Sequence, residues 1–237
     1  MGLERYAQQI KTMKNFTDKT TLTKYLENLK HKPILLVIPA ISLGTPGLNN
    51  QYKDYLDQSA SLYKHLTENN FNVSIFALGA EHRGDGFLHQ IGKDYLMEMY
   101  NIPNEAFVWN DENFKKVGLC SVEEAELLKQ FLTEARKNFI ILTCVSLTQS
   151  TRYLLHQQGY GIKSLYYVFP DKPNYYHLQG LQREKILISI TKTDPTWESE
   201  IGKRLRKSAH SMRDPKEAEI TQKEIREMDD WLSRISL

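Results

Sequence analysis

The sequence has few cysteines, no long apolar segment and almost no net charge, and each shortage excludes a class of protein. Cys120 and Cys144 are its two cysteines, too few for a disulfide framework and without the spacing of metal ligands. No segment approaches the roughly 18 uninterrupted apolar residues that a membrane span needs. A formal net charge of +2 is too small to predict a nucleic-acid partner, and we expect none.

The sequence also lacks signals for export, lipidation or a second domain. Its first residues have no apolar core of a secretory signal, and Tyr6 stands where N-myristoylation usually requires Ser or Thr. Apolar residues make up 41% of the chain, enough for a substantial core. We therefore expect a cytoplasmic protein with one domain, 1–237, whose core spans about 33–192 and whose helical extensions are 1–32 and 197–237.

Apolar runs alternate with helical patterns along the core. The runs that predict strands are 34–38, 73–78 and 139–145, with further candidates at 164–169, 185–190 and 106–109. The helical patterns are 55–69, 91–100 and 121–135, the last opening with a capping box of Ser121 and Glu124. This alternation predicts an α/β fold, a three-layer, Rossmann-like and mainly parallel sheet with helices on both faces.

Both ends of the chain are predicted to be helical. Residues 1–32 carry an amphipathic pattern, and the chain from Trp197 onward is heavily charged. The basic stretch 203–207 lies between acidic segments, a pattern more typical of a salt-bridged surface or self-association than of nucleic-acid binding.

Polar loops follow the first three predicted strands, where open α/β sheets bind their ligands. The loop after Ile38 contains Ser42 and Gly44, and small residues let backbone amides approach an anion. A flexible loop without a ligand is the alternative interpretation. The pattern is neither a dinucleotide fingerprint nor a Walker loop.

The other two loops carry ionisable and amide side chains. Glu81, Arg83 and Asp85 follow the second strand among glycines, where the carboxylates could act as acid or base and the arginine could hold an anion. Gln149 and Arg152 follow the third strand, and Arg152 offers a planar fork for phosphate or carboxylate. Solvated surface loops remain the alternative for both.

The remaining candidates for chemistry favour structural roles. Cys144 near a strand end is more typical of a small buried residue than of a reactive thiol. His89 follows Asp85 by four residues, but one such pair does not make a metal site. The histidines without partners at ligand spacing are His31, His65, His156, His177 and His210. We expect no metal site.

Several short motifs between 33 and 170 form a recognisable series. Tyr100-Asn101-Ile102-Pro103 fits a helix followed by a Gly-Val-Pro-like turn, and 121–125 fits Thr-x-Glu-Asn-Ala, with Glu123 at the acidic position and Glu124 in place of Asn. Thr143-Cys144 fits a strand ending in Thr-Ser, and Arg152 fits the Arg of a downstream His-x-x-Arg. In this order the motifs resemble the bacterial ElyC/SanA/YdcF family.

The resemblance implies a Rossmann-like fold, an envelope- or metabolite-related role and, from one branch, S-adenosylmethionine as a ligand. It also implies that Glu123 and Thr143 contact the ligand. Gln149 stands where the family has His, and an amide can form hydrogen bonds but cannot titrate. The chain lacks the membrane segments of most members and so resembles the soluble branch.

The sequence therefore predicts a protein that binds a small anionic or nucleotide-like metabolite at the carboxyl ends of its strands. The predicted catalytic residues are Glu81 and Asp85, and the predicted ligand-binding residues are Ser42, Gly44, Arg83, Glu123, Thr143, Gln149 and Arg152. The alternative is a catalytically inactive interaction or scaffold protein that uses its charged C-terminal helices. The sequence leaves open whether the protein is an enzyme, what its substrate is, and how it oligomerises.

Overall fold

The computed structural model describes residues 15–40, 50–79, 87–108, 121–146, 153–154, 157 and 160–170. The strands in this part of the chain are β1 (Asn15–Phe16), β2 (Ile34–Ile38), β3 (Val73–Ala77), β4 (Ile140–Ser146) and β5 (Ser164–Phe169). The helices are α2 (Lys19–Glu27), α3 (Asn50–Glu68), α4 (Leu88–Tyr100), the 3-10 helix η1 (Asn104–Ala106) and α6 (Ser121–Ala135).

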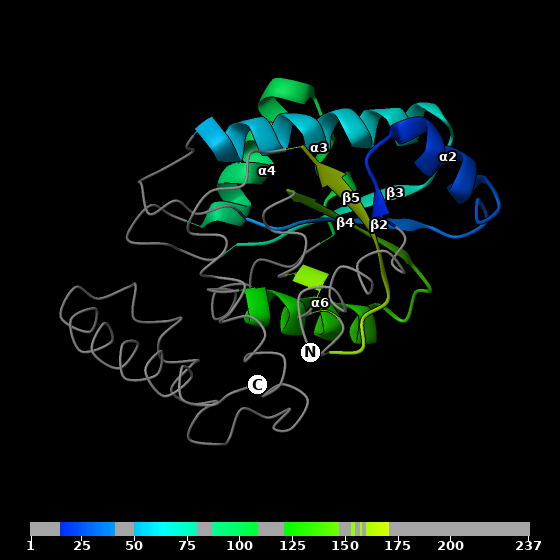
Figure 1. The fold of residues 1–237 in the computed structure, drawn as a ribbon. Coiled ribbons are helices and arrows are strands. Elements are labelled where there is room, and N and C mark those ends of the chain that lie inside the picture. Colours follow the sequence, from blue (N-terminus) through cyan, green and yellow to red (C-terminus); the bar gives the residue numbers. More distant parts are fainter. Residues whose placement is uncertain are drawn as a thin grey trace, which may run out of the picture.

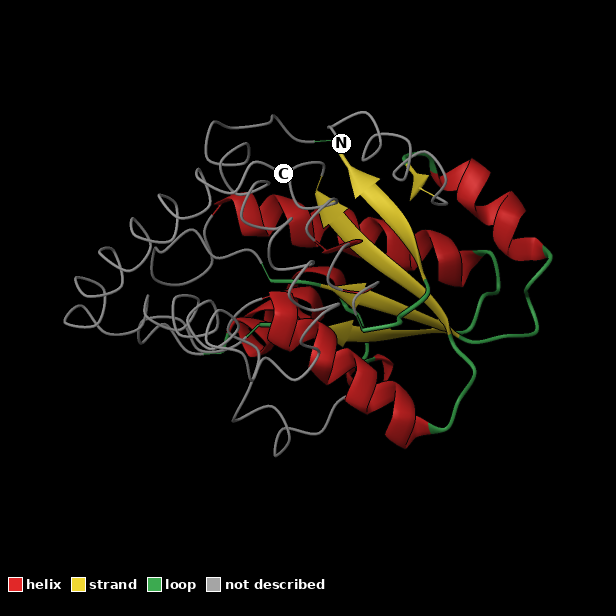
Figure 2. Ribbon diagram, turned by 60° about the horizontal axis from the view of Figure 1, so that its bottom comes forward, coloured by secondary structure: helices red, strands yellow, loops and turns green. Residues whose placement is uncertain are grey.

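These strands form one all-parallel sheet in the order β1-β5-β4-β2-β3. Figure 2 shows the strands running in one direction between layers of helices. A single parallel bridge between Phe107 and Ile75 extends the sheet beyond β3. With β1 left out and the bridge at Phe107 counted as a strand, the order across the sheet is bridge, β3, β2, β4, β5. Numbered along the chain, this order is 3-2-1-4-5, as in the Rossmann fold. The predicted α/β fold is confirmed.

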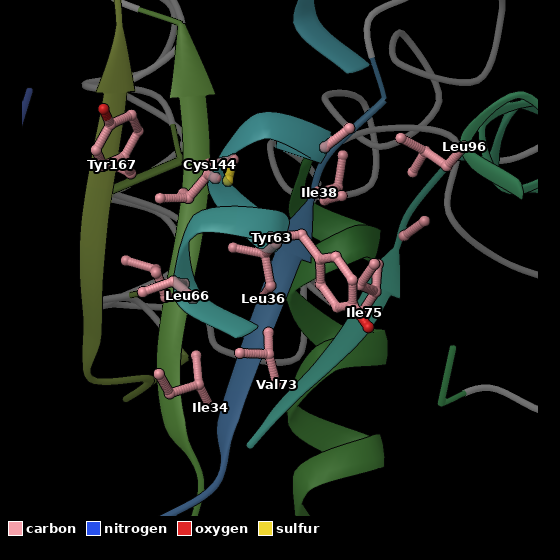
Figure 3. Packing of buried hydrophobic residues seen from close by; sticks show 14 of the residues in the cluster. Ile34, Leu36, Ile38, Tyr63, Leu66, Val73, Ile75, Leu96, Cys144 and Tyr167 are labelled. Atoms are coloured by element: carbon pink, nitrogen blue, oxygen red, sulfur yellow. The ribbon is translucent and has the colours of Figure 1, made fainter. Parts of the chain in front are cut away.

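Alternate residues of each strand pack on opposite faces of the sheet. In β2, Ile34, Leu36 and Ile38 belong to the cluster that also contains residues of α2, α3 and α4. Leu35 and Val37 belong instead to the cluster with α6. Figure 1 shows α3 and α4 on one side of the strands and α6 on the other, and Figure 3 shows the first cluster from close by. Because both faces are covered, strand positions on both faces are apolar.

Local sequence explains where two of the helices begin and end. The Asp18 carboxylate accepts a hydrogen bond from the backbone N–H of Thr21 at 2.7 Å and so caps α2. At the end of α4, Asn101 adopts a left-handed conformation with φ of 52°. Asn tolerates this conformation better than most residues, and Pro103 cannot continue the helix.

Two predictions about elements need correction. The predicted strand at 106–109 is reduced to the bridge at Phe107, because η1 occupies Asn104–Ala106. The prediction that 1–32 is helical is wrong at Asn15–Phe16, which pair with Tyr166 and Tyr167 of β5. Phe16 is only 8% exposed and packs on the Tyr25 ring, so long-range packing determines this strand.

Other predicted elements agree closely or lie outside the described residues. The predicted strand 73–78 extends one residue beyond β3, and 139–145 is shifted by one residue relative to β4. The predictions 34–38 and 164–169 match β2 and β5. The predicted strand 185–190 and the helical extension 197–237 lie outside the described residues. The single-domain boundaries stay a prediction.

Candidate functional site

The strand order reverses between β2 and β4. After β2 the chain adds β3 on one side, and it then returns to the other side of β2 to form β4. Helix α3 packs on one face of the sheet and α6 on the other. Helices that leave to opposite faces open a crevice at the carboxyl ends of the strands between them. The carboxyl ends of β2 and β4 are therefore the candidate site.

The three loops predicted to form the site follow strands that are neighbours in the sheet. Strand β2 pairs with β3 on one side and with β4 on the other, so the ends of all three meet at one edge. The predicted residues that lie outside the described part of the chain are Ser42, Gly44, Glu81, Arg83, Asp85, Gln149 and Arg152. Their contacts stay a prediction.

The other two predicted residues lie on elements that the structure describes, α6 and β4. Glu123 belongs to the first turn of α6, and its side chain is outside the described set. Thr143 lies in β4 and is fully buried. Its Oγ1 accepts a hydrogen bond from Gln157 Nε2 at 3.0 Å. The contact that the structure shows for Thr143 is therefore with the protein itself.

Gln157 continues this hydrogen-bond chain to β5. The Tyr166 hydroxyl donates a short hydrogen bond to Gln157 Oε1, and both residues are at most 2% exposed. One amide thus joins β4, β5 and the segment between them. A buried amide needs both kinds of partner, and the two neighbouring strands supply them.

A buried carboxylate, Glu124, lies near the start of α6 and contacts the segment that follows β4. It is the fourth residue of α6 and only 4% exposed, and its Oε2 accepts a short hydrogen bond from the Tyr153 hydroxyl. The sequence pattern assigns Glu124 to a capping box, and a capping box does not predict this contact. Burial of a carboxylate costs free energy unless hydrogen bonds compensate for the lost water. The hydrogen bond from Tyr153 supplies part of that compensation for Glu124.

Two tyrosines of α3 approach the same region from the opposite face. The Tyr55 hydroxyl donates to the Cys144 carbonyl at 2.7 Å, near the end of β4. The Tyr52 hydroxyl donates to the Leu88 carbonyl at 3.3 Å, at the start of α4. Gly92 leaves room for it, because a Cβ there would lie 2.6 Å from the Tyr52 hydroxyl oxygen.

The electrostatics show that these groups are close enough to affect one another. Burial raises the pKa of Tyr52, and the charge of Glu124 raises it further. Burial also raises the pKa of Tyr55, with smaller contributions from Cys144, Tyr153, Tyr52 and Glu124. Tyr55 of α3 thus contacts β4 near its carboxyl end, and Glu124 of α6 contacts Tyr153 in the segment that follows β4.

The neighbouring edge, between β2 and β3, is closed by close packing. Gly79 has φ of +126°, and a Cβ there would lie 2.9 Å from Leu88 Cβ and closer still to Ala40 Cβ. The Gly79 carbonyl accepts hydrogen bonds from the His89 backbone N–H at 3.2 Å and from its Nδ1 at 2.6 Å. Because a carbonyl can only accept, Nδ1 must carry the proton, and His89 is held in one tautomer.

The predicted burial of Cys144 is confirmed. Its side chain is fully buried, and burial raises the pKa of the thiol from 9.0 to about 12. A thiol that stays protonated near neutral pH is a poor nucleophile and metal ligand. Within the described ranges, no three His, Cys, Asp or Glu side chains are grouped to hold a metal ion. None of the helices described is long and apolar enough to cross a membrane.

Sequence reasoning missed Tyr52, Tyr55 and Tyr153 as members of the site. Tyr52 and Tyr55 are three residues apart, on one face of the helix after β2. Tyr153 follows the polar loop after β4. Because this loop follows the carboxyl end of a strand, its position could have indicated a role for Tyr153 in the site. No protein-family model, curated protein or solved structure matches the chain, so the resemblance to the ElyC/SanA/YdcF family stays a prediction.

Proposed function

We propose that this protein is a divergent member of the ElyC/SanA/YdcF family that binds a small anionic or nucleotide-like metabolite at the carboxyl ends of β2, β3 and β4. S-adenosylmethionine is one candidate ligand, through the family resemblance alone. A cytoplasmic location is part of the proposal, because two cysteines without a disulfide framework fit a reducing compartment.

One observation carries the proposal. Buried polar side chains from both faces of the sheet converge at the reversal of strand order, with Glu124 and Tyr153 hydrogen-bonded there and Tyr55 bonded to β4. Convergent polar groups in such a crevice are typical of ligand sites in α/β proteins. The strand order determines where a ligand would bind, and the polar side chains there would form hydrogen bonds with it.

In this proposal the loops around the crevice bind the anionic part of the metabolite. Arg152 would pair with its phosphate or carboxylate, and the backbone amides near Ser42 and Gly44 would donate hydrogen bonds. Glu81 or Asp85 would supply any acid–base step. The same loops would then account for the ionisable residues that the sequence gathers after three neighbouring strands.

A thermal-shift screen tests the proposal. The panel contains nucleotides, S-adenosylmethionine, sugar phosphates and divalent metal ions at two salt concentrations. A ligand at about 100 times its Kd stabilises the folded state by about 2.7 kcal/mol, which raises the midpoint by roughly 5–10 °C for a chain of this size. We expect a selective shift with at least one phosphate-bearing compound.

Arg152→Ala should abolish the shift without lowering the midpoint of the unliganded protein. Lys137→Ala is the matched control, because it removes an exposed positive charge just before β4, at the opposite end of that strand. No shift with any compound would contradict the proposal and favour an interaction protein that uses its charged C-terminal helices. An equal loss in both variants would contradict the role of Arg152.

A further inference from the structure

The loops that precede the strands of the sheet lie side by side, at the opposite end of the sheet from the proposed metabolite site. In the strand register, Ile34 lies opposite both Val73 and Ile140, so β2, β3 and β4 begin at the same level. Figure 3 shows Ile34 and Val73 toward this end. Two of the loops are in direct contact, since the Ile140 N–H donates to the Pro33 carbonyl at 2.8 Å.

These loops contain cations and amides but no carboxylate. They are residues 28–33 before β2, 69–72 before β3, 136–139 before β4 and 160–163 before β5. Their cations, which we call the amino-end patch, are Lys30, Lys32, Arg136, Lys137 and Lys163. Their amides are Asn28, Asn69, Asn70, Asn72 and Asn138. Since Asp and Glu are absent from all four loops, positive charge accumulates where the loops meet.

No carboxylate among the described residues pairs with a cation of the amino-end patch. Lys30 Nζ lies instead 5.3 Å from the ring centroid of Phe71. Lys137 Nζ lies 5.9 Å from the ring centroid of Phe139. Lys32 is half-buried, and the other cations of the patch are exposed. The patch therefore presents positive charge to the solvent.

Stabilisation of helix ends explains only part of this charge. A cation near a helix C-terminus interacts with the helix dipole mainly within the last turn. The carboxylates nearest along the chain lie in the last turns of α2, α3 and α6, and they are Glu27, Glu68 and Glu134. Arg136 and Lys137 directly follow α6 and suit this role. Lys163 directly precedes β5, and Lys32 lies beyond the turn that follows α2, so these two cations are left for another role.

We propose that the amino-end patch binds the phosphate backbone of a nucleic acid without reading its bases. Lys and Arg make many of the phosphate contacts in such complexes, and Asn amides add hydrogen bonds to phosphate and sugar. Strands β5, β4 and β2 are neighbours in the sheet, about 4.8 Å apart. The cations before these strands therefore form a row that can contact successive phosphates of one strand.

Other anionic partners fit these loops less well. Binding to an anionic membrane surface usually combines cations with apolar side chains that enter the bilayer. Phe71 and Ile162 of these loops are buried, and Met99, the exposed large apolar side chain among the described residues, lies on α4. The cores of protein interfaces are depleted in lysine and enriched in aromatic residues. Exposed lysines and amides favour phosphates over both.

The small net charge of the chain does not exclude this partner. The expectation of no nucleic-acid partner rested on a formal net charge of +2, which balances 31 basic against 29 acidic residues over the whole chain. Electrostatic attraction acts mainly within a Debye length, about 8 Å at physiological salt. The charge within the patch therefore matters more than the average over the chain.

Fluorescence anisotropy of the full chain with a labelled single-stranded RNA and a labelled DNA duplex tests this inference. Both probes have mixed sequence and about 20 nucleotides per strand, and binding is measured at about 50 and 200 mM salt. We expect at least one probe to bind, with an affinity that falls roughly 100- to 500-fold between these salt concentrations, because about five phosphate contacts are made. Excess AMP should not displace the probe, because one phosphate gains only a fraction of those contacts.

Lys32→Gln/Lys163→Gln removes two cations of the patch. We expect affinity at the lower salt concentration to fall by roughly 10- to 100-fold, and the slope of log affinity against log salt to fall by about 1–2. Lys53→Gln/Lys129→Gln is the matched control, because it removes the same charge from exposed positions on α3 and α6. This control should bind as the wild type does. If the first variant fails to fold, Lys163→Gln and Lys53→Gln are compared instead.

Several results would overturn the inference. The first is that neither probe binds, or that AMP displaces the bound probe. Equal weakening in both double variants would make the attraction a property of the overall charge. Binding that survives Lys32→Gln/Lys163→Gln would place the contact elsewhere, such as the basic stretch 203–207, and stronger binding to anionic lipid vesicles than to either probe would indicate a membrane surface. The proposed metabolite site is tested separately, by Arg152→Ala at the other end of the sheet.

Discussion

At the scale of single residues, Gly79 determines how closely the end of β3 approaches its neighbours. Its φ of +126° is strained for any residue with a side chain, and the space beside it is filled by Ala40 and Leu88. Gly161 also has a positive φ, of +72°, but a Cβ there would meet nothing within 4 Å. Backbone strain therefore acts on a substitution at either glycine, whereas steric overlap acts only at Gly79.

Gly79→Ala should therefore destabilise the protein more than Gly161→Ala. We expect a loss of roughly 2–5 kcal/mol at Gly79, where strain and overpacking add, and about 1–2 kcal/mol at Gly161, where only strain acts. Urea unfolding of the two variants measures the difference. Equal losses would show that the end of β3 is less tightly packed than the structure indicates.

The residue scale is also where sequence reasoning fell short. Glu124 fits a capping box three residues after Ser121, and that local pattern accounts for it without any long-range contact. Its partner Tyr153 is 29 residues away and reaches it only because α6 and the segment after β4 lie on the same face of the sheet. Such pairs cannot be read from spacing along one helix.

At the scale of elements, the Thr143–Gln157–Tyr166 chain connects β4 and β5 to the residues between them. Thr143 is fully buried, and Gln157 Nε2 donates to it at 3.0 Å. Val has nearly the same shape as Thr but cannot accept a hydrogen bond. Thr143→Val therefore leaves a buried amide donor without this acceptor, a loss that usually costs about 1–3 kcal/mol.

A double-mutant cycle of Thr143→Val and Gln157→Leu measures this connection. We expect each single variant to be destabilised and the double variant to be less destabilised than the sum, with a coupling of about 1 kcal/mol or more. Urea unfolding supplies the free energies. Strict additivity would mean that the hydrogen bond contributes no coupling and that the position of Gln157 depends on apolar packing alone.

Elements were predictable in proportion to their length and apolar content. Strands β2, β3, β4 and β5 are each at least five residues long, and continuous apolar runs marked them to within a residue. Strand β1 has only two residues, and its pairing with β5 joins segments about 150 residues apart. No local pattern contains that information.

At the scale of the whole molecule, the sheet order explains why three distant loops belong together. The sequence placed polar residues after three strands, but only the pairing of β2 with both β3 and β4 makes those ends neighbours. Ligands of parallel α/β sheets bind at the carboxyl ends of the strands, and this rule led us to expect that the three loops lie together. The position of the reversal between β2 and β4 required the structure, because strand order is set by packing across the whole fold.

Buried tyrosines and a buried thiol make the stability of the whole molecule sensitive to alkaline pH. Burial raises the pKa of Tyr52, Tyr55 and Tyr166 above 10.0 and that of Cys144 from 9.0 to about 12. Above pH 9 the unfolded chain loses these protons while the folded chain keeps them, so unfolding becomes more favourable. The free energy that these buried, protonated groups contribute to folding is fully present below about pH 8.5 and is lost as pH rises.

We therefore expect the free energy of unfolding to fall by roughly 2–4 kcal/mol between pH 8.5 and 10.5. Urea unfolding at several pH values measures it. In Cys144→Ala the decline should begin about one pH unit later, because only the tyrosines then contribute. Stability that rises or stays level over this range would contradict the burial of these groups.

The most direct test of the central claim is a methyl NMR titration with AMP and ribose 5-phosphate. The methyl groups of Ala40, Leu78 and Leu88 report on the carboxyl ends of the strands, and those of Ile34, Val73 and Ile140 report on the amino ends. The proposed site predicts that at least one compound shifts the first set and leaves the second unchanged. Shifts confined to the second set, or none in the first with either compound, would contradict it.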